Sequence, residues 1–80
     1  MTLKEGTVGK RYRIEGIKGG GALKRRVMDM GLTKGSEIYL RKVAPLGDPI
    51  QISARNYELS LRKADAEIIE ITEIEQEVNI

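Results

Sequence analysis

The chain has 80 residues with 14 basic and 12 acidic side chains, a formal net charge of +2, and neither His nor Cys. At this length we expect one domain over residues 1–80, with a single compact core and no large catalytic cleft. Without His or Cys, the sequence excludes disulfide scaffolds, zinc fingers and histidine general-base catalysis. Because it has no long apolar run, we expect a cytoplasmic protein that does not insert into a membrane.

The charges are unevenly distributed along the chain. Residues 1–42 carry eleven basic and four acidic side chains, whereas residues 43–80 carry three and eight. The two halves can neutralise each other on folding, so a basic half is weaker evidence for nucleic acid than a basic chain. RNA binding therefore remains a second hypothesis. The cations that would serve it are Lys10, Arg11, Arg13, Lys18, Lys24, Arg25, Arg26, Arg41 and Lys42.

The first predicted elements are a strand and a helix. Tyr12 and Ile14 alternate with charged neighbours and predict a strand. Apolar residues at i, i+4 and i+7 then predict an amphipathic helix over Ala22–Met30, with Gly31 as a left-handed cap. The apolar residues of this stripe are Leu23, Val27 and Met30.

Alternation with period two dominates after residue 36 and predicts further half-buried strands. We therefore predict a mainly β fold, a small barrel of about five antiparallel strands with one short inserted helix. Tyr12, Tyr39 and Tyr57 all lie at alternating strand positions, which would allow at least two of them to face the core. The apolar positions of the later strands are Ile38 and Leu40; Ile50, Ile52 and Ala54; Tyr57, Leu59 and Leu61; and Ile69 and Ile71.

The connections between strands follow from turn residues. Pro45–Pro49 predicts a loop, because proline cannot donate to an interior ladder and Gly-Asp favours a turn. Arg55 and Asn56 predict a tight hairpin in which Asn56 tolerates positive φ. Thr72–Ile80 has no turn signal, and we expect residues 73–80 to be a frayed tail.

No catalytic, metal or cofactor site is predicted. The run Gly19–Gly21 lacks the Lys-Ser/Thr pair of a phosphate-binding loop, and no Ser or Thr has an imidazole to activate it. A C-terminal acidic series is better explained as a solvated face than as a metal site. Its members are Asp65, Glu67, Glu70, Glu73, Glu75 and Glu77.

Two apolar residues are candidates for contact with a partner. Met28 lies off the apolar stripe of the helix, and Leu46 lies in the proline-bounded loop, where neighbours hold it outward. The cations at the start of the helix oppose its dipole, which fits either a solvated surface or an anionic partner. Two adjacent apolar side chains would be stronger evidence than one, and the sequence does not give their separation.

Three segments resemble the FeoA family, the small ferrous iron transport protein A. They are RRVMDMGLTKG (Arg25–Gly35), APLGDPI (Ala44–Ile50) and YELSLRKADAEII (Tyr57–Ile69). The resemblance implies an SH3-like barrel. It also implies a non-enzymatic accessory or regulatory protein that binds FeoB, the membrane GTPase that carries ferrous iron into bacteria.

From this resemblance we predict that the helix and the loop together dock onto FeoB. The apolar residues would form the buried centre of the contact and the Arg pair would orient it. The alternatives are a basic small-barrel RNA-binding protein and weak self-association through exposed barrel edges. The predicted partner-binding residues are Arg25, Arg26, Met28, Pro45, Leu46, Gly47, Asp48 and Pro49.

Overall fold

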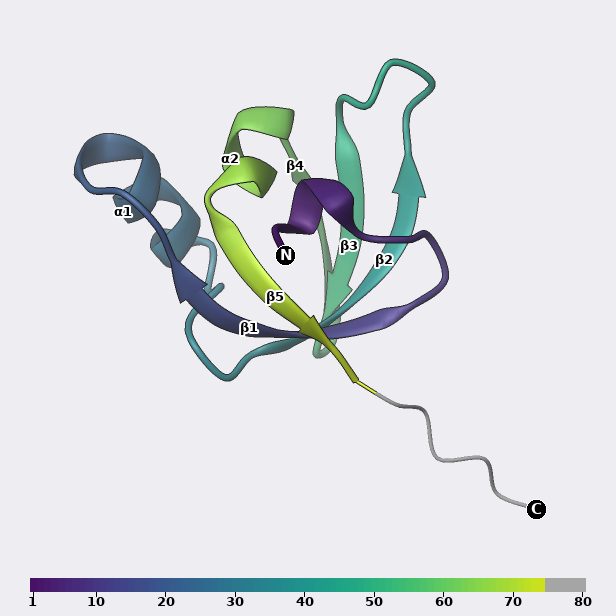
Figure 1. Cartoon of the computed structure of the whole chain (residues 1–80), viewed down its shortest axis with the longest axis horizontal. Coiled ribbons are helices and arrows are strands. Elements are labelled where there is room, and N and C mark those ends of the chain that lie inside the picture. The colour runs from purple at the N-terminus through teal and green to yellow at the C-terminus, as the bar shows by residue number, and fades with distance from the viewer. Residues whose placement is uncertain (75–80) are drawn as a thin grey trace.

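A computed structural model of the chain describes residues 1–74. Five antiparallel strands form one curved sheet with the order β4-β3-β2-β1-β5 (Figure 1). This confirms the predicted mainly β fold. The strands are β1 (Arg11–Ile17), β2 (Glu37–Val43), β3 (Ile50–Ala54), β4 (Tyr57–Leu61) and β5 (Ile69–Glu73). The helical elements are the 3-10 turn η1 (Leu3–Glu5) and the helices α1 (Gly21–Asp29) and α2 (Lys63–Glu67).

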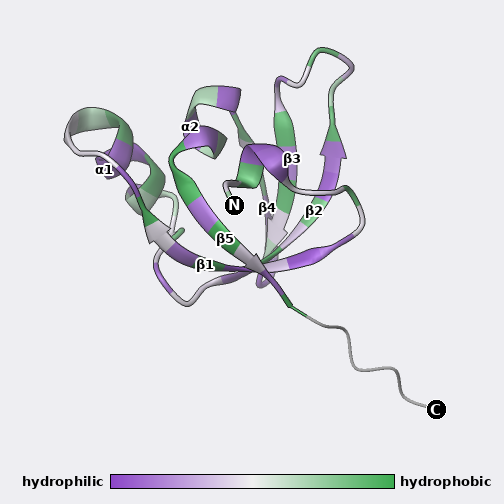
Figure 2. Cartoon of the chain, in the orientation of Figure 1, coloured by the Kyte–Doolittle hydropathy of each residue, from purple (hydrophilic) through white to green (hydrophobic). Residues whose placement is uncertain are grey.

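The core lies on the concave face of the sheet and follows the period-two pattern. Hydrophilic and hydrophobic residues alternate along β2 and β5 (Figure 2). Ile38 of β2 lies opposite both Tyr12 and Ala54 in the strand register, so their side chains share one face. The buried core consists of Leu3, Tyr12, Ile14, Val27, Leu32, Ile38, Leu40, Ile50, Ile52, Ala54, Leu61, Ala66, Ile69 and Ile71.

The inserted helix α1 forms where the 3.6-residue stripe predicts it. Val27 is fully buried, and Met30 packs against the core from the end of the helix. Gly31 follows with a φ of 87°, and its N–H donates to the carbonyl oxygen of Met28 at 2.9 Å. A left-handed residue in this position satisfies an end carbonyl and stops the helix, which confirms the predicted cap.

Two further helical segments, η1 and α2, were not predicted. They contact each other and lie side by side beside the curved sheet (Figure 1). Leu3 of η1 and Ala66 of α2 are both buried. A five-residue helix is too short to show a period in the sequence, so its stability comes from these tertiary contacts.

The structure differs from the sequence analysis in two local details. Arg55, not Asn56, has the positive φ of the β3–β4 turn, at 54°. Only Tyr12 lies in the core, since Tyr39 is 38% and Tyr57 40% exposed. Tyr39 lies between two buried residues of β2, and the alternation of a strand therefore turns it outward.

The C-terminal boundary also differs from the prediction. β5 continues through Glu73, beyond the point at which we expected a tail to begin. The Ile74 N–H then donates to the Arg11 carbonyl oxygen at 3.0 Å. The remaining residues of the predicted frayed tail, 75–80, lie outside the described residues.

Candidate functional site

The helix α1 presents Arg25 and Met28 to solvent. Both are exposed, Met28 to 45%, while the intervening Val27 is buried. The C-terminal end of the helix is fixed to the sheet, because the Tyr57 hydroxyl of β4 donates to the Met30 carbonyl oxygen at 3.1 Å. The two predicted contact residues therefore lie on a helix that is held firmly at its end.

Arg26 has a structural contact that the sequence did not reveal. Its Nη2 lies 3.4 Å from Oδ2 of Asp65, whose side chain is fully buried. The same Oδ2 accepts the Arg62 N–H at 2.9 Å at the start of α2. The prediction that Asp65 belongs to a solvated acidic face is therefore wrong. Arg26 joins α1 to α2 and is only partly available to a partner.

Asp65 also has one buried oxygen, Oδ1, without a hydrogen-bond partner among the described residues. A buried carboxylate is costly unless its charge is compensated, so this side chain depends on its two contacts at Oδ2. The sequence did contain one signal for it. An acidic residue three positions after Arg62 is in the place where a capping carboxylate accepts a first-turn N–H.

The β2–β3 loop places Leu46 at the surface. The Gly47 N–H donates to the Ala44 carbonyl oxygen at 2.7 Å, and the Ala44 N–H donates to the Pro49 carbonyl oxygen at 3.1 Å. Gly47 has a φ of 83°, a conformation that side chains disfavour. These turns leave Leu46 91% exposed, in agreement with the predicted outward orientation.

The loop is attached to α2 as well. Oδ1 of Asp48 accepts the N–H of Lys63, the first residue of α2, at 3.2 Å. Asp48 therefore has a structural contact in addition to its predicted role in binding. α2 is thus joined to the loop by Asp48 and to α1 by the pair of Arg26 and Asp65.

The predicted binding residues lie in two separate parts of the molecule. We call these residues, Arg25, Arg26, Met28 and 45–49, the α1–loop surface. Its two parts lie on opposite sides of α2, with α1 on one side and the β2–β3 loop on the other (Figure 1). Met28 and Leu46 are therefore not neighbours. Each is the exposed apolar residue of its own element, and α2 lies between the two elements.

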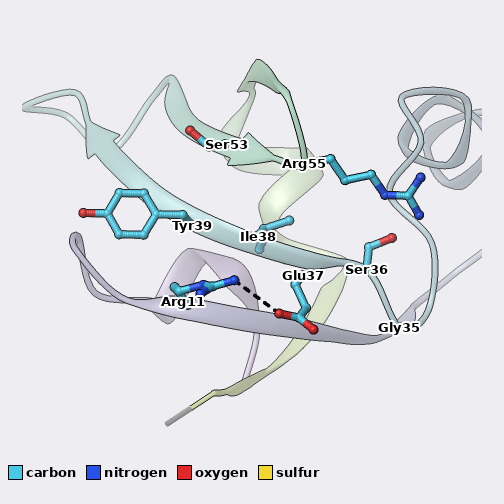
Figure 3. A pocket seen from close by; sticks show the side chains of 8 residues that line it. All are labelled: Arg11, Gly35, Ser36, Glu37, Ile38, Tyr39, Ser53 and Arg55. Carbon is cyan, nitrogen blue, oxygen red and sulfur yellow. Dashed lines mark hydrogen bonds and ion pairs between the residues drawn. The ribbon is translucent and has the colours of Figure 1, made fainter. Parts of the chain in front are cut away.

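A hollow of about 670 Å³ lies elsewhere, on the outer face of β1, β2 and β3 (Figure 3). None of the residues predicted to bind FeoB is among its lining residues, whereas Arg11 was a candidate for RNA binding. We call it the outer hollow. Arg55 was not a candidate from the sequence, because a positive φ at this position is visible only in the folded hairpin. The lining residues are Arg11, Gly35, Ser36, Glu37, Ile38, Tyr39, Ser53 and Arg55.

The basic and acidic halves of the chain pair with each other. Lys10 Nζ lies 2.8 Å from Oε1 of Glu73, and Lys18 pairs with Glu70. Hydrogen bonds to these carboxylates raise the pKa of Lys10 and of Lys18, and the bond from Lys18 lowers the pKa of Glu70. Five cations predicted for RNA have an acidic partner, which weakens that hypothesis. They are Lys10, Arg11, Lys18, Arg26 and Arg41.

Residues 1–74 contain no group of three or more acidic side chains placed to hold a metal ion. None of the helices described here is long and apolar enough to cross a membrane.

Comparison with known proteins identifies the family. The FeoA domain family matches residues 1–73 of the chain. An Fe(2+) transport protein A/Fe(2+) transporter FeoB fusion protein of Porphyromonas gingivalis is 35% identical over 71 residues. The match covers 89% of this chain and 8% of the fusion protein, so the chain corresponds to a small part of that relative.

Solved structures agree in fold. A FeoA-like protein from Clostridium acetobutylicum is 35% identical with a TM-score of 0.88, covering 100% of this chain and 93% of that one. FeoA of Stenotrophomonas maltophilia, described as a prokaryotic SH3 domain protein, is 24% identical with a TM-score of 0.77, covering 90% and 89%. The expected SH3-like architecture is therefore confirmed. With the family match over residues 1–73, these findings show that the chain belongs to the FeoA family.

Proposed function

We propose that this protein is a small cytoplasmic accessory and regulatory protein of bacterial ferrous iron uptake, and that it binds the membrane GTPase FeoB. One observation carries the proposal. In the Porphyromonas gingivalis relative, a segment 35% identical to this chain is fused to the transporter FeoB. Fusion keeps two modules together at a high effective concentration. When the same two modules are separate chains, they need affinity for each other to associate.

The α1–loop surface supports the binding role. Leu46, at 91% exposure, and Met28, at 45%, are apolar side chains that a partner would remove from water. A few residues that become fully buried supply most of the affinity of an interface, and charged residues at its rim mainly set orientation and association rate. Arg25 is the exposed cation beside Met28 that is suited to the second task.

The spacing of the two anchors adds a constraint on the partner. α1 and the loop are both joined to α2, by the pair of Arg26 and Asp65 and by the bond from Lys63 to Asp48. A braced arrangement loses little conformational entropy on binding, which favours affinity. FeoB would therefore offer two apolar contact points, one for each element, rather than one large groove.

The experiment is a measurement of affinity between the full chain and detergent-solubilised FeoB. We expect Leu46→Ala and Met28→Ala each to weaken binding by about tenfold, the effect of losing an interface anchor. Val8→Ala is the matched control, because Val8 is 50% exposed and lies outside the α1–loop surface. Arg25→Glu should mainly slow association and reduce its salt dependence.

The possible outcomes distinguish a failure of the proposed function from a failure of the proposed binding surface. Wild-type protein that fails to bind FeoB contradicts the proposed function. Wild-type binding that persists unchanged in folded Leu46→Ala and Met28→Ala variants contradicts only the surface. Arg26→Glu is unsuitable as a probe, because it would place a carboxylate beside the buried Asp65 and disturb the fold.

A further inference from the structure

The outer hollow contains a side chain held on unfavourable backbone. Arg55 has a φ of 54°, in the left-handed region. This conformation costs a residue with a Cβ about 1 kcal/mol, and turns normally place Gly or Asn there. Asn56 is the next residue, yet Arg55 occupies the strained position. Backbone strain of this kind is concentrated at functional sites, so the side chain at this position needs an explanation.

The Arg55 side chain lines the hollow from the β3–β4 turn, and Arg11 lines it from β1 across β2 (Figure 3). Arg11 Nη2 lies 3.3 Å from Oε1 of Glu37, and these side chains are 51% and 49% exposed. Arg55 makes no ion pair within residues 1–74. The lining therefore contains two cations and one carboxylate, a net positive charge.

The hollow also offers apolar and hydroxyl contacts. The ring of Tyr39 is on the outer face and 38% exposed, and its register partners are Arg11 and Ser53. Ser36 and Ser53 supply hydroxyl groups at the rim (Figure 3). The Tyr39 ring and the Arg55 guanidinium group point toward opposite ends of the hollow (Figure 3), so an extended chain that combines carboxylates with an apolar side chain would reach both.

We propose that the outer hollow binds an extended acidic peptide segment of a partner protein. Its carboxylates pair with the guanidinium groups of Arg55 and Arg11, and an adjacent apolar side chain packs on the Tyr39 ring. This binding site shares no residue with the α1–loop surface and does not depend on the proposed association with FeoB.

Charge favours a peptide over nucleic acid. Glu37 lines the hollow, and Glu58 of β4 pairs with Arg41 of β2. A nucleic acid carries a phosphate at every step and would meet these carboxylates repeatedly, at a cost in repulsion. A peptide carries its carboxylates at chosen positions, so it can place them at Arg55 and Arg11 and keep its uncharged positions beside Glu37.

The test is an NMR titration of the ¹⁵N-labelled full chain at low salt. The probe is an acetylated and amidated pentapeptide, Glu-Glu-Leu-Glu-Glu, and the neutral control replaces each glutamate with glutamine. We expect the acidic peptide alone to shift the amides of Arg11, residues 36–39 and residues 53–55. Shifts that are absent, or that map outside the outer hollow, overturn the proposal.

Variants of the full chain sharpen the result. Arg55→Asn keeps the left-handed turn favourable while removing the charge, and we expect peptide binding about three- to tenfold weaker without loss of folding. Glu37→Gln removes the competing carboxylate and should strengthen binding. Arg62→Gln is the control, because it removes an exposed cation outside both the hollow and the α1–loop surface and should leave the affinity unchanged.

Two other occupants are distinguished by the same spectra. A uridine octamer that shifts the same amides more tightly than the peptide would show a nucleic-acid site and overturn the proposal. A Glu75→Gln/Glu77→Gln variant tests the chain's own acidic segment. If this change alone shifts the amides of the hollow, that segment fills the site and the partner peptide is excluded.

Discussion

Two regions of the molecule each contain an ion pair between an arginine and a carboxylate, but one pair is buried at its carboxylate and the other is exposed. They are the contact of α1 with α2 through Arg26 and Asp65, which we call the α1–α2 corner, and the outer face of β1–β3. At the corner, Arg26 meets an Asp65 side chain that is fully buried. On the outer face, Arg11 and Glu37 are 51% and 49% exposed. Exposed pairs contribute little, whereas a buried carboxylate that loses its partner is strongly destabilising. The corner therefore holds the fold together, and the outer face can exchange its pairs for those of a ligand.

The largest expected effect comes from separating the buried pair. Arg26→Gln leaves the Asp65 carboxylate without its cation, and we expect the free energy of unfolding to fall by about 2–3 kcal/mol. Urea denaturation monitored by circular dichroism measures the change. Arg25→Gln, on the same helix but exposed, should change stability by less than about 0.5 kcal/mol. Equal losses in the two variants would remove the distinction between corner and surface.

A second substitution tests the other attachment of α1. A Cβ at Gly31 would lie 2.7 Å from the Tyr57 hydroxyl, and the φ of 87° disfavours any side chain. Gly31→Ala should therefore displace the bond from Tyr57 to Met30 and cost about 1–2 kcal/mol. Gly20→Ala is the control, since no atom lies within 4 Å of its added Cβ and its φ is −148°. A Gly31→Ala variant as stable as the control would show that α1 does not depend on this contact.

This corner also marks the limit of prediction from the sequence. The strands and α1 were predictable because each buries one face, and the spacing of apolar residues records that face directly. α2 was not predictable, because five residues show no period. Its contacts come from elements distant in sequence, Asp48 in the β2–β3 loop and Arg26 in α1.

For the candidate sites the sequence was informative about exposure and not about proximity. Leu46 and Met28 were correctly predicted to be exposed from their place in a turn and off a helical stripe. That α2 lies between their elements depends on how the chain closes, which no local pattern records. Arg55 was missed for a different reason. Its significance comes from a backbone angle of 54°, and the Arg-Asn pair itself suggests that Asn takes that angle.

Acid titration tests the contribution of one ion pair at the sheet edge, that of Lys18 with Glu70. The hydrogen bond from Lys18 lowers the pKa of Glu70 below its ordinary 4.5. The stabilisation is therefore present above pH 4.5 and is lost as the pH falls through the lowered pKa of the folded state. Glu70→Gln should flatten the fall in Tm between about pH 6 and about pH 3. Glu15→Gln is the control, because Glu15 is exposed and belongs to none of the ion pairs within residues 1–74. An equal flattening in both variants would contradict a specific role for Glu70.

The smallest expected change in stability has the opposite sign. Arg55→Asn replaces a residue strained at a φ of 54° with one that tolerates this angle, so the free energy of unfolding should stay constant or rise by up to about 0.5 kcal/mol. Thermal denaturation of this variant and of Arg26→Gln measures the contrast. We expect Arg26→Gln to lose stability and Arg55→Asn to lose none. A clear fall in Tm would mean that Arg55 supports the fold. A gain in stability combined with weaker peptide binding would show that the chain retains this arginine for recognition at the expense of its own turn.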